Sequence, residues 1–442
     1  MPRISTGSTR NSTKRWNSTI PIWLAGRYST AGIRMQLCNA RRIMINTLSP
    51  GIAWSIKAHG TSINCSASGC GYPYRVRQLL PYQPSTQIKD PMNTQAAFII
   101  GTGRCGSTLL SKMINAYAGI TSVSEFFSMI TDLGTMIPEA FPEGPVSGAA
   151  FWNILSGIYP KQNTMLRHGV AMKEVLYTDR PDAAFRAATG VPALLQTTLP
   201  HLTEDHDALF EALAREVSCW PSATVAVHYQ QFMQTLCRQF GDVLWVERSG
   251  GSLRIVHRLY EAFPRARYVH LVRDGRNCAL SMEKHLGFRM AMLSFQMIEV
   301  LGVDPYLSDD REFVDDLPDE LVDFLPENFN PEAFRNYSDT QASLFGHYWS
   351  GELIQGLETL QKMPAEQLLT VSYEDLLEYP ERTFRTIIEF LAPDRVDMDQ
   401  IREVCRLVGR PRSDWQALPK RERELLARSC EPGFMALEAN VH

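Results

Sequence analysis

The chain has 442 residues, 44% of them hydrophobic, and a formal net charge of −4 at pH 7; this fits a globular protein and gives no support for nucleic acid as a partner. Nine cysteines form no C-x-x-C pair and no zinc spacing, which favours a reducing, cytoplasmic compartment without a disulfide framework. No apolar run reaches the roughly 18 residues that a transmembrane helix needs.

The first 91 residues differ in composition from the rest. They contain twelve Lys or Arg but one acidic residue, Asp90, and are rich in Ser, Thr, Asn and Gly without a period. One interpretation is an organellar transit peptide. The other, which we favour, is a start assigned too far upstream, with Met92 as the true start just before the first core strand. Either way, we expect residues 1–91 to be disordered and residues 92–442 to form one elaborated domain.

Residues 96–112, AAFIIGTGRCGSTLLSK, contain the most informative motif. The apolar run 96–100 predicts a buried strand, and residues 101–106 form a turn punctuated by glycine. Residues 107–114 then begin a helix with its apolar side chains on one face. This order is typical of an anion-binding loop, because backbone N–H groups and the helix dipole point toward the ligand.

The loop departs from the nucleotide-binding pattern G-x-x-x-x-G-K-[ST] at one position. Gly101 and Gly106 have the required spacing, but Ser107 takes the place of the lysine. The positive charge comes instead from Arg104, inside the loop. A Mg-nucleotide hydrolase is therefore disfavoured, whereas Arg104 and the hydroxyls of Ser107 and Thr108 suit a phosphate or a phosphosulfate. The alternative is a tight strand–helix turn that binds no ligand.

A second motif, ARYVHLVRDGRNCALSME at 266–283, again predicts a strand, a turn and a helix. Arg273 comes at the carboxyl end of the predicted strand 268–272, where open parallel sheets bind their ligands. Ser281 follows eight residues later, about two helical turns on. A strand-end arginine and a helix hydroxyl can together hold one phosphate from two sides.

Two stretches are predicted to form a helical cap, at about 193–240 and 286–345. Within the second, residues 286–302 are apolar and rich in methionine. Methionine adapts to irregular surfaces, so this stretch could line an apolar pocket, although such a stripe is more often core. The acidic run 304–334 is interpreted as a solvated face.

The motifs resemble those of sulfotransferases that use 3′-phosphoadenosine 5′-phosphosulfate (PAPS). GTGRCGSTLL at 101–110 is similar to their 5′-phosphosulfate loop, and RDGRNCALS at 273–281 to their 3′-phosphate motif. A third segment, VSYEDLLEYPERTFRTIIEFL at 371–391, is similar to a late strand–turn–helix segment of bacterial members. The resemblance extends over about residues 94–436. It implies an α/β, P-loop NTPase-like three-layer fold with a central parallel sheet and a helical cap insertion.

The resemblance also implies which residues bind the donor. Arg273 and Ser281 would hold the 3′-phosphate, the group that distinguishes PAPS from ATP. The residues expected to hold the 5′-phosphosulfate come from the loop and are Gly103, Arg104, Cys105, Gly106, Ser107 and Thr108.

Glu125, in SVSEFFSMI, is the candidate catalytic base. It lies 21 residues after Arg104, the offset at which sulfotransferases of the tyrosylprotein type carry a catalytic glutamate. A base there would activate an acceptor hydroxyl. The alternative is that Ser124 and Glu125 begin a helix, with the carboxylate complementing its dipole.

Arg248, in LWVERSGGSLRIV, is the candidate second catalytic cation. Related enzymes often have a lysine here, and Arg248 keeps the 16-residue distance to Pro264 that the tyrosylprotein-type lysine has to its own Phe-Pro. A cation here would stabilise charge on the bridging oxygen and the leaving phosphate. Arginine stays protonated, so it is a poor proton donor. The alternative is an ion pair with Glu247 or another carboxylate on the surface.

Other candidates are weaker. Cytosolic-type sulfotransferases use a histidine base, but His201, His206 and His228 lie in no segment similar to that motif. They are interpreted as surface or packing residues, and His270 as a structural residue within its strand. Lys173 could approach the site from a strand end.

The sequence therefore predicts in-line transfer of a sulfuryl group from PAPS to a hydroxyl or amine, with catalysis by positioning and charge stabilisation and no metal required. Small-molecule, lipid, glycan and peptide acceptors remain open, and so does a homodimer. One alternative is a kinase-like P-loop enzyme, which would need the missing lysine. The other is a non-catalytic nucleotide-binding protein.

Overall fold

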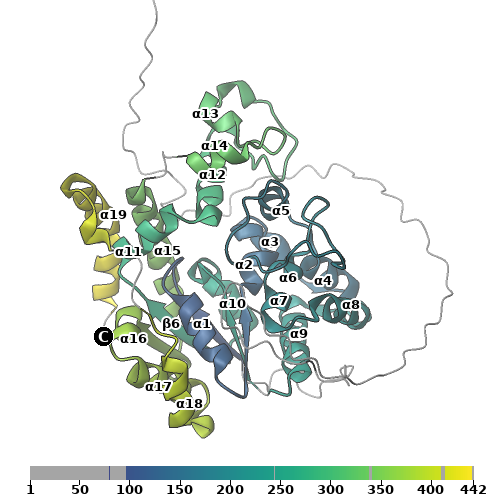
Figure 1. Cartoon of the computed structure of the whole chain (residues 1–442), viewed down its shortest axis with the longest axis vertical. Helices are drawn as coiled ribbons and strands as arrows, with labels where there is room; N and C mark the ends of the chain where they lie inside the picture. Colours follow the sequence, from purple (N-terminus) through teal and green to yellow (C-terminus); the bar gives the residue numbers. More distant parts are fainter. Residues whose placement is uncertain (1–78, 80–95, 243, 338–340, 410–413, 441–442) are drawn as a thin grey trace, which may run out of the picture. The chain divides into compact units, whose positions relative to one another are not determined.

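The computed structural model describes residues 79, 96–242, 244–337, 341–409 and 414–440 (Figure 1). The predictions for residues 1–91, other than Leu79, and for Met92 lie outside the described residues. Tyr74–His442 form one compact unit, and the elements below all belong to it.

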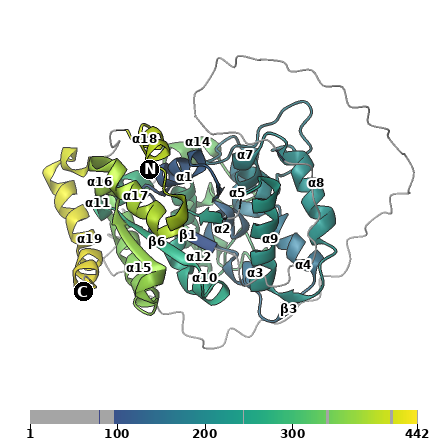
Figure 2. The ribbon, with the colours of Figure 1, turned by 90° about the horizontal axis from the view of Figure 1, so that it is seen from below.

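A five-stranded parallel sheet organises this unit (Figures 1 and 2). Each neighbouring pair of strands runs parallel, which confirms the predicted central parallel sheet. With β1 in the middle, the loop after it opens at the carboxyl edge between its two neighbours. The spatial order is β2 (Ile120–Ser124), β5 (Leu244–Arg248), β1 (Ala96–Ile100), β6 (Arg267–Val272) and β7 (Leu368–Ser372).

Side chains of β1 alternate between two cores, because successive residues of a strand point to opposite faces. Ala97 and Ile99 belong to a buried cluster with apolar side chains of the helices on one face. Phe98 points the other way. Its ring centroid lies 6.5 Å from that of Phe127, in the helix 126–130, and 5.0 Å from that of Phe263, directly after the helix 256–262. Helices therefore cover both faces, as the three-layer prediction requires. Those of the first face are α1 (Ser107–Ala116), α16 (Tyr373–Glu378), α17 (Pro380–Leu391) and α18 (Met398–Cys405).

The chain between β2 and β5 is mainly helical. It includes the predicted insertion at 193–240, but its last helix, α9 (Val225–Gln239), packs against β5 and so helps to cover the sheet. Two short antiparallel strands, β3 (Pro145–Val146) and β4 (Ala223–Thr224), also occur here. The other helices are α2 (Phe126–Ile130), α3 (Ile137–Ala140), α4 (Gly148–Leu155), α5 (Pro160–Arg167), α6 (Ala193–Gln196), α7 (Thr198–Leu202) and α8 (His206–Val217).

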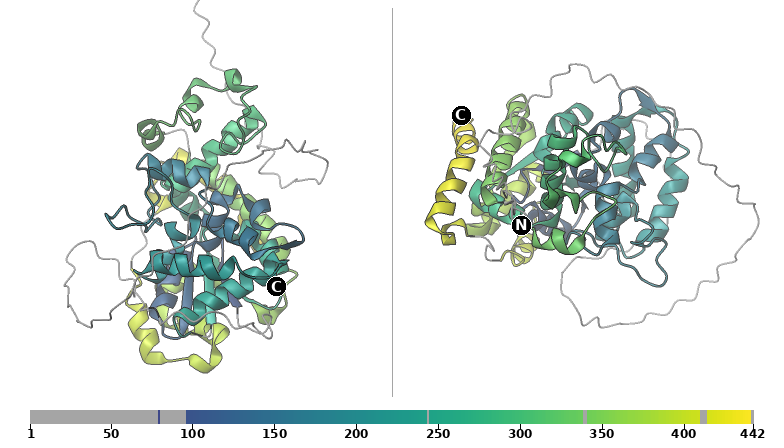
Figure 3. Two further views of the ribbon diagram at one scale, coloured as in Figure 1. Left: turned by 90° about the vertical axis from the view of Figure 1, so that its right-hand side faces the viewer. Right: turned by 90° about the horizontal axis from the view of Figure 1, so that it is seen from above.

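The second predicted insertion, 286–345, contains α12 (Leu286–Leu301), α13 (Asp319–Val322) and α14 (Pro331–Asn336), which lie at the opposite end of the unit from α17 and α18 (Figures 1 and 3). Met290, Met292 and Met297 of α12 are all buried, so the methionine stripe is core. The α-helices of the described residues not yet named are α10 (Val256–Ala262), α11 (Gly275–Glu283), α15 (Ala342–Leu360) and α19 (Lys420–Ala439), and a short 3-10 helix, η4 (Ser252–Ile255), precedes α10. Helices α11, α15 and α19 pack against one another.

Truncation of Ile388 tests the packing of the third sequence motif. Ile388 is fully buried in the cluster beneath α17, so Ile388→Ala should lower the free energy of unfolding by about 2–5 kcal/mol. The exposed neighbour Glu389, as Glu389→Ala, should change it by less than about 0.5 kcal/mol. Urea denaturation measures both; equal effects would contradict this packing.

Candidate active site

The glycine-rich loop has the predicted strand–turn–helix geometry. β1 ends at Ile100, α1 begins at Ser107, and no side chain caps this helix N-terminus. Gly106 has a left-handed φ of 100°, and a Cβ there would collide with the ring of Tyr373. Only glycine suits both demands, so Gly106 allows Tyr373 to cover the loop.

Two loop residues predicted to hold the donor, Cys105 and Gly103, make other contacts in the structure. The side chain of Cys105 is buried in the core beneath the loop, where burial raises the pKa of its thiol. Cys105 can therefore meet a ligand only through its backbone. The Gly103 N–H donates to Glu352 Oε2 at 3.2 Å, so it is directed toward α15.

Glu125 and Arg248 form a buried ion pair. Their strands end side by side, since Ser124 of β2 pairs with Arg248 of β5. One guanidinium nitrogen of Arg248 donates to Glu125 Oε1, and the other donates to Ser124 Oγ at 2.7 Å. Glu125 Oε2 accepts from Ser128 Oγ at 2.7 Å and from the Gly250 N–H at 2.9 Å. The pair is not on the surface, and Glu247 is not its carboxylate.

Arg104, Ser281 and Arg273 converge beside the loop. Arg104 Nε donates to Ser281 Oγ at 3.2 Å, and Arg273 donates to the Arg104 carbonyl at 2.9 Å. The Arg273 guanidinium also lies 4.8 Å from the ring centroid of Tyr373, in a cation–π contact. Residues from all three sequence motifs therefore meet at one point.

Glu174 is a site residue that the sequence reasoning missed. It accepts from Arg104 at 2.9 Å and pairs with His285 Nε2 at 3.0 Å. Burial opposes ionisation, but the hydrogen bond with His285 and the charges of His285 and Arg104 together hold the pKa of Glu174 well below its ordinary value. Its neighbour Lys173, considered from the sequence, is exposed.

Two further carboxyl groups near the site, those of Glu352 and Glu247, are buried. Burial raises the pKa of Glu352 to about 7, despite the opposing charge of Arg254 and the hydrogen bond from the Gly103 N–H. Burial also raises the pKa of Glu247 to about 8, although Ser249 donates a hydrogen bond to it at 2.6 Å. Both groups lie outside the set predicted from the sequence.

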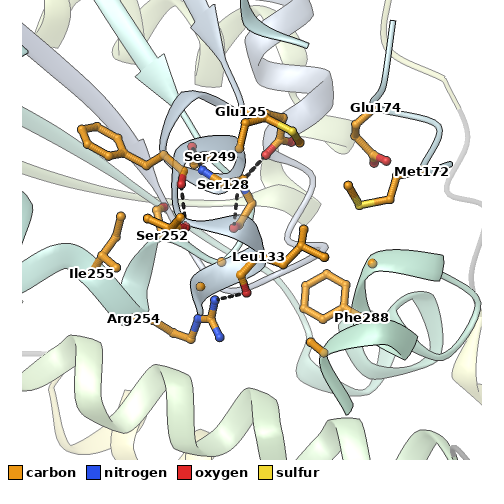
Figure 4. A pocket seen from close by; sticks show the side chains of 18 of the residues that line it. Glu125, Ser128, Leu133, Met172, Glu174, Ser249, Ser252, Arg254, Ile255 and Phe288 are labelled. Carbon is orange, nitrogen blue, oxygen red and sulfur yellow. Dashed lines mark hydrogen bonds between the residues drawn. The ribbon is translucent and has the colours of Figure 1, made fainter. Parts of the chain in front are cut away.

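A cavity opens next to Glu125 (Figure 4). Glu125 and Glu174 are in its wall. The remaining lining comes from the segment after β2, from Met172, from residues 249–255, from α12 and from Tyr348 of α15. The α12 residues that line it are Gly287, Phe288 and Ala291, not the methionines. Thus α12 contributes to both the core and the cavity.

The site thus joins a phosphate-type loop, converging arginines, a buried glutamate–arginine pair and an adjacent cavity. The sequence model of the family described as "Sulfotransferase family" matches residues 96–330. This range contains the glycine-rich loop, Glu125, Arg248 and the motif at 273–281, but not the third segment at 371–391. The chain belongs to this family. Membership supports sulfuryl transfer in general and a role as a transferase.

Solved structures similar to this sulfotransferase share little sequence with it. A sulfotransferase from Alicyclobacillus acidocaldarius is 15% identical, with a TM-score of 0.35, over 79% of this chain and 96% of its own. A sulfotransferase from Mycobacterium avium is 13% identical, with a TM-score of 0.40, over 79% and 77%. A retinol dehydratase, solved with retinol and PAP, is 12% identical, with a TM-score of 0.28, over 78% and 81%. No curated protein matches the chain.

The four histidines considered from the sequence, His201, His206, His228 and His270, are packing residues, as interpreted there. His201, His206 and His228 are buried, and His228 stacks on Phe151 at 4.9 Å. His270 is buried in β6, and burial lowers its pKa to about 4. In the described part of the chain, no cluster of three or more His, Cys, Asp or Glu could hold a metal ion. None of the described helices combines the length and apolar character needed to cross a membrane.

Backbone conformation is the signal that could have singled out this site without any motif. Among the described residues, four other than glycine have a positive φ, and they are Arg104, Glu125, Asp132 and Leu133. Such residues tend to cluster at functional sites. The first two are the predicted loop cation and base, and Leu133 lines the cavity.

Glu352 should make the stability of the sulfotransferase pH-dependent. Its pKa rises from 4.5 to about 7 on folding, so the unfolded chain loses this proton first and stability falls as pH rises between these values. Glu352→Gln should remove up to about 3 kcal/mol of that fall, at about 1.4 kcal/mol per pKa unit. Urea denaturation from pH 5 to 8 measures it.

The exposed Glu358 lies on the same helix and provides a matched control. Glu358→Gln should leave the fall in stability between pH 5 and 8 as it is in the unaltered protein. If Glu352→Gln also left that fall unchanged, the assignment of a raised pKa to the buried carboxyl of Glu352 would be wrong.

Proposed function

We propose that this sulfotransferase moves the sulfuryl group of PAPS to a hydroxyl of an acceptor bound in the cavity beside Glu125. The observation that carries this proposal is the position of the Glu125 carboxylate. It is fixed by Arg248, Ser128 and Gly250, and it lies in the wall of a cavity. Two other lining residues, Ser252 and Phe288, adjoin Gly101 and Gly103 of the glycine-rich loop.

The donor would bind over the loop and the N-terminus of α1. Arg104 would contact the phosphosulfate, together with backbone N–H groups of Gly106, Ser107 and Thr108 and the two hydroxyls. Arg273 and Ser281 would hold the 3′-phosphate. Because Arg104 Nε and Ser281 Oγ are 3.2 Å apart, we expect the two ends of the donor to bind next to each other, with cations on both.

Glu125 would act as the base. Its carboxylate would take the proton of the acceptor hydroxyl while the acceptor oxygen bonds to sulfur and the bond from sulfur to the bridging oxygen breaks. 3′-Phosphoadenosine 5′-phosphate (PAP) would then leave. Positioning and charge stabilisation are expected to dominate such an in-line transfer, as in phosphoryl transfer.

Arg248 would act mainly by orienting Glu125. Two of its nitrogens already bond to Glu125 and Ser124, which favours a positioning role over the leaving-group contact expected from the sequence. Arg104, whose side chain is 30% exposed, is better placed to supply charge to the donor.

Removing the carboxylate should separate turnover from donor binding. Glu125→Gln keeps the shape but cannot accept a proton, so kcat should fall by about 10²- to 10⁴-fold. The affinity for PAP, measured by calorimetry on the same preparation, should remain unchanged. The exposed Glu211 of α8 supplies the control variant Glu211→Gln, which should keep full activity. Full turnover by Glu125→Gln would remove Glu125 as the base.

Calorimetry tests the donor site directly. The unaltered protein should bind PAP much more tightly than adenosine 5′-monophosphate or ATP, with or without magnesium. Arg273→Ala removes a charged hydrogen-bond partner of the 3′-phosphate. The affinity for PAP should therefore fall by roughly 10- to 100-fold, while the affinity for adenosine 5′-monophosphate stays the same. The exposed Arg385 of α17 gives the matched control Arg385→Ala.

Two outcomes would contradict the donor proposal. A preference for Mg-ATP over PAP would favour a kinase-like enzyme. Equal affinity of Arg273→Ala and the unaltered protein for PAP would remove Arg273 from the 3′-phosphate site.

A further inference from the structure

The cavity beside Glu125 has largely apolar walls. The space inside it, with the open solvent at its mouth included, is about 690 Å³. Leu133, Met172, Ile255 and Phe288 line it (Figure 4), together with Ala291 and Tyr348. These side chains come from five separate parts of the chain, so the apolar character belongs to the folded site.

Most polar groups of the wall already bond to the protein. Ser128 donates to Glu125, and Ser249 donates to Glu247. Ser252 accepts from the Gly101 N–H, and Arg254 donates to the Leu133 carbonyl at 3.0 Å. Figure 4 shows two of these bonds, from Ser128 to Glu125 and from Arg254 to the Leu133 carbonyl.

Glu174 is engaged in the same way, with Arg104 and His285. Glu125 also has room for a further hydrogen bond. Each carboxylate oxygen has about two acceptor positions. Glu125 Oε1 receives one hydrogen bond, from Arg248, whereas Oε2 receives two. One acceptor position on Glu125 is therefore available for a hydroxyl in the cavity.

We infer that the acceptor is a compact apolar alcohol or phenol. This inference rests on the proposed function and names the substrate class of the same site. The hydroxyl of the acceptor meets Glu125, and its hydrocarbon body packs against Leu133, Met172 and Phe288. Burial of that body against apolar walls supplies the binding free energy.

The same walls disfavour a glycan or a peptide. Each additional hydroxyl or amide of such an acceptor loses water on entering the cavity. Since Ser128, Ser249, Ser252 and Arg254 already have protein partners, that group gains little in return, and a buried polar group without a partner weakens binding. The specificity for the acceptor therefore comes from the scarcity of hydrogen-bond partners in the cavity wall as much as from apolar contact.

Two matched pairs of acceptors test the inference on the full-length protein. 4-Ethylphenol and N-acetyltyrosinamide share the reacting phenol but differ by two amides. Cyclohexylmethanol and methyl glucopyranoside share a hydroxymethyl group on a six-membered ring but differ by further hydroxyls. In each pair, kcat/KM with PAPS should be at least about tenfold higher for the apolar member. Binding to the PAP-loaded protein, measured by ligand-observed NMR, should follow the same order.

A variant that fills the cavity locates the acceptor. Ala291→Phe should lower kcat/KM for 4-ethylphenol by about tenfold or more, because the ring occupies space that the acceptor needs. Its affinity for PAP should stay unchanged, which also shows that it is folded. Glu299→Phe introduces the same side chain at an exposed position of α12 and should have no effect.

The outcomes separate this inference from the proposed function. Equal or better use of the amide or the glucoside overturns the inference, and so does full activity of Ala291→Phe. PAP binding without binding of either apolar acceptor overturns it too, but leaves the donor site in place. A folded protein that binds no PAP overturns the proposed function itself.

Discussion

The buried pair between Glu125 and Arg248 is the interaction on which the site depends. Both residues lie at strand ends and are at most 6% exposed. Removing two charges from water is costly, so such a pair persists only with good geometry and additional hydrogen bonds. Ser124, Ser128 and Gly250 supply these bonds, and the Glu125 N–H donates to the Arg248 carbonyl at 2.6 Å. The pair thereby fastens the carboxyl ends of β2 and β5 to each other and holds a carboxylate in one orientation.

The site has two chemically different sides. On one side, the loop after β1 brings Arg104, Ser281 and Arg273 together, which suits a highly charged donor. On the other, the cavity presents Leu133, Phe288 and other apolar side chains. An in-line transfer needs the attacking and leaving groups on opposite sides of the reacting atom. Under the proposed function, the donor would lie on the charged side and the acceptor on the apolar side, which would meet this need.

Much of the fold was predictable because its signals are local. The apolar run 96–100, the glycine spacing after it and the helix from Ser107 depend on backbone sterics and periodicity, and the structure has these elements at the predicted positions. The parallel sheet follows from strands that alternate with helices. The insertion at 193–240 was harder to interpret, since its last helix, α9, serves the sheet as well. Periodicity shows that a helix has an apolar face, but not which element will cover it.

By itself, the sequence determined the loop, the strand-end Arg273 and the family resemblance, because each depends on residues close together in the chain. Only the tertiary structure decided what these residues meet. Arg248 turned inward to Glu125, Cys105 turned into the core, and the Gly103 N–H met Glu352, a residue 249 positions away. Glu174 and the cavity walls likewise come from distant segments. Parallel strands bring their carboxyl ends to one edge regardless of sequence separation, so the partners at that edge follow from strand order and packing, which no local pattern contains.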